Sequence, residues 1–178
     1  VFLKKFLVFL SVFILCAFLT AFAVAQVEHP DEVGEVVTNL VKKVSPAVVI
    51  VYTYDSQGNA VGQGTGFLVS ADGAIITNYH VLKGAASAQI KTAADKTFPV
   101  KSIIAEDKEN DLVKIAINAK EITFPTVTLA KEDIEVGQRV VVIGGPLGLE
   151  GTVSDGIVSA VRDIPAYGKI IQMTAPVS

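Results

Sequence analysis

Two residues of this sequence have the types and the placement that acid–base catalysis requires. His80 follows an apolar run and the tripeptide Thr77-Asn78-Tyr79, and Asp111 stands where a polar loop enters the apolar residues 112–117. An imidazole titrates near neutral pH and can take a proton from a serine hydroxyl, and a carboxylate on its other nitrogen fixes its tautomer and stabilises the imidazolium. The pair therefore predicts a hydrolytic site in which His80 is the general base and Asp111 orients it.

Each of these residues also has an ordinary explanation. A single histidine at the end of a strand is most often a hydrogen-bonded structural residue, and an aspartate before a strand is typical of a solvated turn. Glu106, Asp107 and Glu109 are acidic neighbours of Asp111 with a weaker placement relative to the following strand. The catalytic interpretation requires the side chains of His80 and Asp111 to meet.

Other kinds of site find little support. A phosphate-binding loop needs both a strand before it and a helix after it, and neither glycine-rich stretch, 62–66 or 144–148, has both; the first runs directly into Phe67-Leu68-Val69. His29 and His80 are far apart, and the single cysteine, Cys16, lies near the N-terminus, so no zinc-binding spacing is present. Acidic and basic residues are interspersed at a formal net charge of −3, which offers no surface for a nucleic-acid backbone. We expect no metal ion, no cofactor and no nucleic-acid partner.

The first 25 residues have the order of a secretory leader. Lys4-Lys5 precedes the apolar run 6–19, and residues 21–25 supply the small side chains that signal peptidase requires. Cleavage would leave a mature chain beginning at Gln26, but an uncleaved anchor remains open because about 20 apolar residues span a bilayer. In both cases the rest is exported. We expect a periplasmic or extracellular protein that contacts the inner membrane only if its leader stays uncleaved.

The remaining sequence predicts one short helix followed by strands. Between Pro30 and Ser45 apolar residues recur at helical spacing, with Asp31 placed to cap the first turn and Pro46 ending the run. From Ala47 on, short runs rich in valine, isoleucine, threonine and tyrosine alternate with turn residues, which is typical of an all-β architecture. The expected strands are 48–54, 66–70, 74–78, 88–91, 97–105, 112–117, 139–143, 151–161 and 170–174.

A lapse of strand character and a rise of charge around residues 118–135 predict a link between two β-subdomains. The predicted organisation is a leader at 1–25, a linker with the helix at 26–46, and a β-rich domain at 47–178 whose two parts cover about 47–120 and about 121–178.

Six motifs in one order and spacing resemble the HtrA/Deg proteases, a trypsin-like family. They are Gly64-Thr65-Gly66-Phe67-Leu68-Val69, Thr77-Asn78-Tyr79-His80-Val81, Asn110-Asp111-Leu112-Val113, Val136-Gly137-Gln138-Arg139-Val140, Gly144-Gly145-Pro146-Leu147-Gly148 and Gly156-Ile157-Val158-Ser159-Ala160. The resemblance implies a chymotrypsin/trypsin-like double six-stranded β-barrel, the first barrel complete and the second incomplete. It also implies an active site between the barrels, with His80 as general base and Asp111 as its orienting acid.

The resemblance further implies a nucleophilic serine just beyond Ser178. In the family, a segment like 171–178 is followed within a few residues by Gly-Asn-Ser-Gly-Gly, which holds the nucleophile and the oxyanion-hole amides. Ser178 precedes that signature and lacks flanking glycines, so we do not expect it to be catalytic. These 178 residues are thus expected to be an inactive fragment of a serine endopeptidase that degrades unfolded or damaged proteins in the cell envelope.

Two other functions remain open. One is a protease-like protein without catalysis that holds polypeptides as a binding or chaperone module, and the other is a membrane-anchored stress sensor whose leader is never removed. The family often forms trimers, and many members carry PDZ domains. The resemblance therefore implies unfolded protein or peptide substrates and a homotrimer.

Overall fold

The computed structural model describes residues 32–119, 121–144, 151–165 and 168–177. The chain divides into two compact units, Val1–Val36 and Val37–Ser178. The leader expected at residues 1–25 and the helix cap expected at Asp31 lie outside the described residues. Within the described ranges, no helix has the length and apolar character needed to cross a membrane.

The predicted helix is present as α2 (Glu32–Val44), followed by a short 3-10 turn, η1 (Ser45–Ala47), that contains Pro46. Proline has no backbone N–H and cannot continue an α-helix, which explains the change of helix type at this point. Two apolar residues of α2, Val36 and Leu40, are exposed to solvent.

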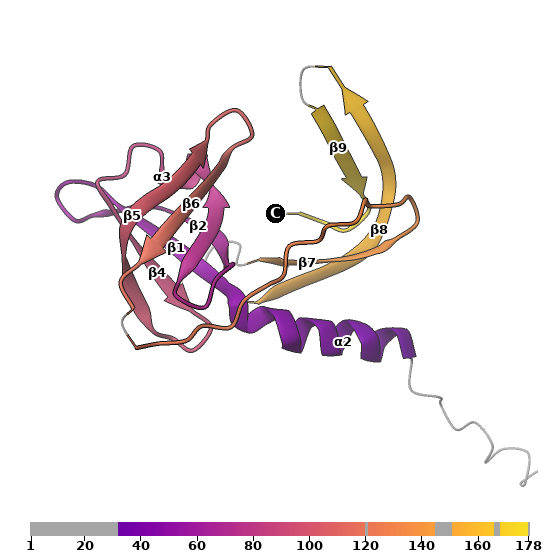
Figure 1. Ribbon diagram of the computed structural model, residues 1–178, viewed down its shortest axis with the longest axis horizontal. Coiled ribbons are helices and arrows are strands. Elements are labelled where there is room, and N and C mark those ends of the chain that lie inside the picture. The colour runs from indigo at the N-terminus through magenta and orange to yellow at the C-terminus, as the bar shows by residue number, and fades with distance from the viewer. Residues whose placement is uncertain (1–31, 120, 145–150, 166–167, 178) are drawn as a thin grey trace, which may run out of the picture. The chain divides into compact units, whose positions relative to one another are not determined.

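Six antiparallel strands close a barrel in the order β1-β2-β3-β6-β5-β4 (Figure 1). The strands are β1 (Val48–Tyr54), β2 (Ala60–Leu68), β3 (Ala74–Asn78), β4 (Ser87–Thr92), β5 (Thr97–Asp107) and β6 (Leu112–Ile117). A single helical turn, α3 (Tyr79–Leu82), follows β3 directly.

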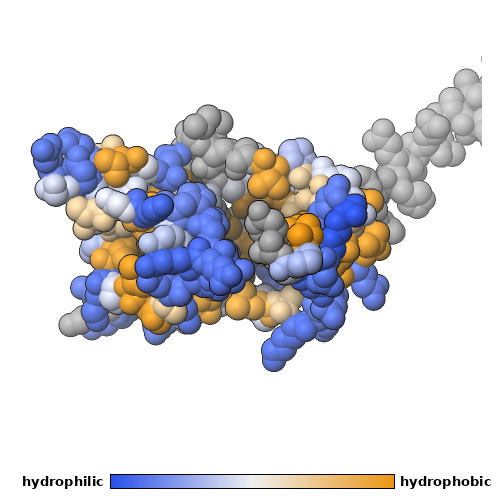
Figure 2. Space-filling model, turned by 90° about the horizontal axis from the view of Figure 1, so that it is seen from above, coloured by the Kyte–Doolittle hydropathy of each residue, from blue (hydrophilic) through white to orange (hydrophobic). Residues whose placement is uncertain are grey.

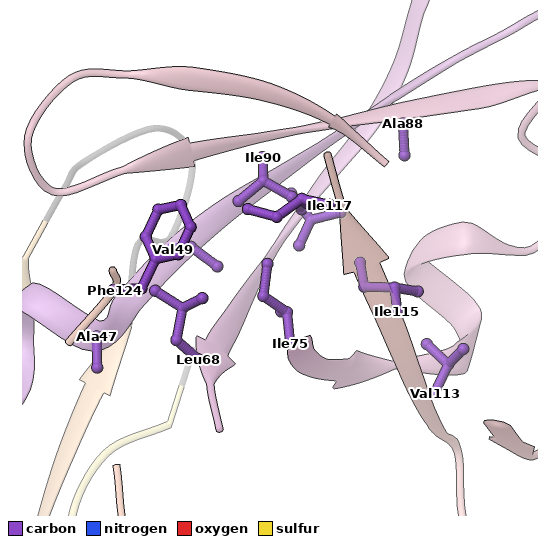
Figure 3. Packing of buried hydrophobic residues seen from close by; sticks show 11 residues of the cluster. Ala47, Val49, Leu68, Ile75, Ala88, Ile90, Val113, Ile115, Ile117 and Phe124 are labelled. Carbon is purple, nitrogen blue, oxygen red and sulfur yellow. The ribbon is translucent and has the colours of Figure 1, made fainter. Parts of the chain in front are cut away.

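The barrel interior is filled by branched apolar side chains. Because successive residues of a strand point to opposite faces, every second residue of β6 is buried, namely Val113, Ile115 and Ile117. Leu68 and Ile75 are completely buried and belong to the same cluster. Figure 3 shows these side chains gathered in one interior. The core is therefore built from the strand periodicity that the sequence predicts.

Residues 121–138, which follow the barrel, contain no helix or strand. Their first half nevertheless belongs to the barrel, because the backbone N–H of Phe124 donates to the carbonyl of Ala71 and that of Val127 donates to Leu68. Phe124 is buried and packs edge-to-face against Phe98, with ring centroids 5.4 Å apart. The sequence predicts a link here but not its return to the core.

A second sheet follows, with three antiparallel strands in the order β7-β8-β9. The strands are β7 (Arg139–Gly144), β8 (Thr152–Ile164) and β9 (Gly168–Met173). Val158 of β8 is fully buried, and its backbone N–H donates to the carbonyl of Gln138. An exposed ion pair between Arg139 and Asp155, at 2.6 Å, joins β7 to β8.

Large hydrophobic side chains also reach the surface. In the face that Figure 2 shows, hydrophobic residues (orange) stand among hydrophilic ones (blue). The exposed apolar residues of β5, β8 and β9 are Ile103, Ile104, Val153, Ile157, Ile164, Ile170, Ile171 and Met173.

The prediction of an all-β fold with a short N-terminal helix is confirmed, and each expected strand is present. The main difference is β2, which begins at Ala60, six residues before the expected start at Gly66. Gly62 and Gly64 weaken the local strand signal, since glycine is poorly represented in strands. Their backbones nevertheless pair with Thr53 and Val51 of β1.

Gly73 provides a test of how tightly the barrel end is packed. Its φ is +95°, and a Cβ placed on it would lie 2.7 Å from Cγ1 of Ile117, whereas Gly84, with φ +80°, would meet no atom within 4 Å. We expect Gly84→Ala to lower the free energy of unfolding by about 1 kcal/mol through backbone strain alone. Gly73→Ala adds overpacking and is expected to cost about 2 to 4 kcal/mol. Urea unfolding measures both; equal losses would contradict the packing argument.

Candidate active site

The pairing of β3 with β6 brings His80 and Asp111 to the same end of the barrel. Asn78, the last residue of β3, lies opposite Leu112, the first residue of β6. His80 lies two residues beyond the end of β3, in α3, and Asp111 immediately precedes β6. Two residues 31 positions apart in the chain are therefore adjacent in space because of a strand register.

The side chains of His80 and Asp111 are in direct contact. Nδ1 of His80 lies 2.6 Å from Oδ2 of Asp111, and the backbone N–H of His80 donates to Oδ1 at 2.8 Å. Asp111 has a positive φ of 55°, a conformation that aspartate tolerates better than most residues. Its carbonyl accepts from the backbone N–H of Tyr79 at 3.0 Å. One residue thus receives hydrogen bonds from the backbone and the imidazole of the α3 turn.

These hydrogen bonds favour the ionised form of Asp111. Those from the His80 side chain and then from the His80 backbone N–H hold the pKa of Asp111 below its ordinary value. Asp111 is therefore ionised at neutral pH and can only accept hydrogen bonds, so Nδ1 of His80 must carry the proton. The remaining ring nitrogen, Nε2, is then the basic one.

The lowered pKa also fixes how the contact responds to acid. Because the folded-state pKa lies below the unfolded one, the stabilisation by ionised Asp111 is complete above its ordinary pKa and is lost as the pH falls through the lowered value. The side chains are 68% (His80) and 42% (Asp111) exposed, and solvent weakens such pairs. The contact therefore orients the imidazole more than it stabilises the fold.

The other acidic candidates have different partners. Asp107 accepts from the backbone N–H of Asn110 at 3.0 Å and from its side-chain amide at 2.8 Å, and these bonds, the side-chain one first, lower the pKa of Asp107. Glu106 pairs with Lys108 at 3.0 Å. Asp107 thereby closes the turn that precedes Asp111, while Asp111 itself meets His80.

The α3 turn lies close against β2. A Cβ on Gly64 would come within 2.5 Å of Cγ2 of Val81, the residue after His80, so only glycine fits there without displacing the turn. The hydroxyl of Thr77 donates to the carbonyl of Thr65 at 2.7 Å, which ties β3 to β2 just before the turn. Gly64 therefore leaves room for the side chain of Val81, and Gly66 lets β2 approach the backbone carbonyl of Ile76 in β3, which a Cβ would meet at 3.0 Å.

A hollow of about 410 Å³ lies beside His80. Its lining includes Val61, Gly62, Gln63, Val81 and Lys83. Among the described residues, no group of three or more His, Cys, Asp or Glu side chains could hold a metal ion. His29, Cys16, Ser178 and residues 145–148 lie outside the described part of the chain.

Sequence reasoning missed one contributor to this arrangement. The side-chain amide of Asn78 donates to both the carbonyl and Oδ2 of Asp111, each at 3.2 Å. The motif around His80 contains Asn78, but only the register of β3 and β6 shows that its amide faces Asp111.

Comparison with known proteins shows which proteins this chain is similar to. Residues 64–178 match the family model described as "Trypsin-like peptidase domain". A "Probable periplasmic serine endoprotease DegP-like" of Pseudomonas fluorescens is 38% identical over 128 residues, covering 70% of this chain and 26% of that protein. "Serine protease HTRA2, mitochondrial" of Bos taurus is 30% identical over 132 residues, covering 71% of this chain and 28% of that protein. The chain spans about a quarter of the length of these curated relatives.

Among solved structures, the chain is similar to that described as "Crystal structure of Deg5". The two share 31% sequence identity and superpose with a TM-score of 0.73, over 85% of this chain and 78% of the other. The barrel and the following sheet thus have a counterpart over most of their length.

Proposed function

The chain belongs to the HtrA/Deg group of trypsin-like peptidases, and on this premise we propose that it supplies the general base and the orienting acid of a serine endopeptidase. The contact between Nδ1 of His80 and Oδ2 of Asp111 carries the proposal, because it leaves Nε2 free to act as the base. The expected trypsin-like fold class is confirmed by the same similarity.

The proposed reaction is peptide-bond hydrolysis through an acyl-enzyme. A serine oxygen attacks the peptide carbonyl carbon while its proton passes to Nε2 of His80. The imidazolium then gives this proton to the leaving nitrogen as the C–N bond breaks, and the same base activates the water that releases the acid product. Asp111 remains ionised throughout and stabilises the imidazolium.

We propose the substrates and the location from the family of the chain and from its first 25 residues. The relative from Pseudomonas fluorescens is named a periplasmic endoprotease, and the first 25 residues of this chain have the order of a secretory leader. The proposed enzyme is exported to the periplasm, degrades unfolded or damaged proteins there and assembles as a homotrimer. N-terminal sequencing of the exported protein tests the leader, since a start at Gln26 would exclude a permanent anchor.

The nucleophile is expected in the sequence that follows residue 178. We predict a Gly-x-Ser-Gly motif within about a dozen residues, whose backbone amides would form the oxyanion hole beside the serine. The 178-residue chain alone is then expected to release no peptides from casein, whereas the full-length protein digests it. Sequencing the adjoining reading frame and a casein assay check both parts; a downstream sequence without the motif would refute the assignment.

A further inference from the structure

Asn78 holds Asp111 at two points. Its amide nitrogen lies 3.2 Å from the backbone carbonyl oxygen of Asp111 and 3.2 Å from Oδ2. A primary amide has two N–H groups, so both bonds can form at once. One side chain therefore connects the main chain of Asp111 to its own carboxylate.

This bridge restricts the rotation of the carboxylate. Oδ1 accepts a hydrogen bond from the backbone N–H of His80 at 2.8 Å, and Oδ2 accepts one from Nδ1 of the His80 imidazole at 2.6 Å. Because the carboxylate is 42% exposed, water competes for both oxygens, and Asn78 occupies an approach to Oδ2 that water would otherwise take.

We propose that Asn78 is a positioning residue that keeps the carboxylate of Asp111 directed at Nδ1 of His80. The expected effect of Asn78 on turnover rests on the proposed function. Its expected effect on which ring nitrogen of His80 carries the proton does not depend on catalysis. Asn78 acts through Asp111, and nothing assigns it contact with the substrate.

The effect on turnover is expected to be moderate. Both bonds lie at the long end of the hydrogen-bond range and are exposed to solvent. In the full-length protein, Asn78→Ala is expected to lower kcat about tenfold with little change in KM, as for the loss of one hydrogen bond to a charged group.

Asn78→Asp distinguishes positioning from simple space filling. Aspartate has almost the same size as asparagine but offers only acceptor oxygens, so two carboxylates would face each other where a bond existed. We expect Asn78→Asp to lower kcat about a hundredfold, more than alanine does. If the aspartate variant is the milder of the two, Asn78 only fills space and the proposal is wrong.

Asn110→Ala is the matched control. Asn110 is also exposed and donates its amide to a carboxylate, that of Asp107, at 2.8 Å, in the loop that carries Asp111. Its loss is expected to change kcat less than about twofold, because its amide bonds Asp107 at the surface and not Asp111 or His80. An equal loss in both alanine variants would show that loosening of the loop is responsible, which would overturn the proposal.

A spectroscopic measurement separates this inference from the protease assignment. Long-range ¹H–¹⁵N NMR spectra of the 178-residue chain report which ring nitrogen of His80 carries the proton. We expect Nδ1–H to predominate in the unaltered chain and in Asn110→Ala, and the Nε2–H fraction to rise in Asn78→Ala and further in Asn78→Asp. An unchanged tautomer ratio in both Asn78 variants would overturn the positioning role even if the full-length protein is a protease.

Discussion

Replacement of His80 by alanine in the full-length protein should abolish measurable proteolysis, with a fall in kcat of about 10⁵- to 10⁶-fold. Without the imidazole, no group of the described site can take the serine proton, and ionised Asp111 is left facing solvent. Substrate binding uses other contacts, so KM should change little. Release of peptides from casein at neutral pH measures the effect.

His29→Ala is the control for this experiment. It removes the other histidine of the sequence by the same chemical change, and full activity is expected. If casein digestion survived His80→Ala unchanged, the activity would belong to another site or to a contaminant. The chain would then fit better with a protease-like module that binds polypeptides without cleaving them.

The strands could be predicted from the sequence because their signal is local. Alternate burial along β6 follows directly from the apolar pattern of residues 112–117. The pattern fails at the start of β2, where Gly62 lies against Thr53 of the neighbouring strand. A glycine suits position 62 because the side chain of Thr53 lies close by, and this contact between strands leaves no trace in the local apolar pattern.

The contact of His80 with Asp111 follows from a nonlocal property. The sequence placed one residue after a strand and the other before a strand, but their meeting depends on the register that sets Asn78 opposite Leu112. A shift of the register by one residue would separate the two side chains. The expectation of a contact came from chemistry and family resemblance, and the register supplies its physical cause.

Irregular segments were the least predictable. Phe124 lies in a stretch with weak strand character, yet it is buried against Phe98 and lies beside Ile117 near Gly73. No periodicity marks such a residue, because it lies outside the strands and its backbone N–H donates to the carbonyl of Ala71 in a loop. Its burial follows from the shape of a cavity that exists only after the strands have closed.

Asp111→Asn is expected to lower kcat about 10⁴-fold in the full-length protein while leaving its fold intact. The new amide has one oxygen and one NH₂ group to place in the positions of Oδ1 and Oδ2. The backbone N–H of His80 needs an acceptor at the Oδ1 position, so the oxygen goes there and the NH₂ group faces Nδ1. His80 must then accept at Nδ1 and carry its proton on Nε2, which removes the base.

The same geometry makes Asp111→Asn worse than a loss of charge alone. In that orientation the NH₂ group of residue 111 also faces the amide NH₂ of Asn78. Two donors then stand where the unaltered protein has a hydrogen bond of 3.2 Å from Asn78 to Oδ2 of Asp111. Asn78→Ala combined with Asp111→Asn removes this conflict but leaves the wrong tautomer. Relative to Asp111→Asn, the double variant is therefore expected to regain part of the lost free energy of unfolding but no activity, because Asn78→Ala also removes the bond to the carbonyl of residue 111. Urea unfolding and casein digestion of the single and double variants test this, and recovery of activity in the double variant would show that tautomer control is not the role of Asp111.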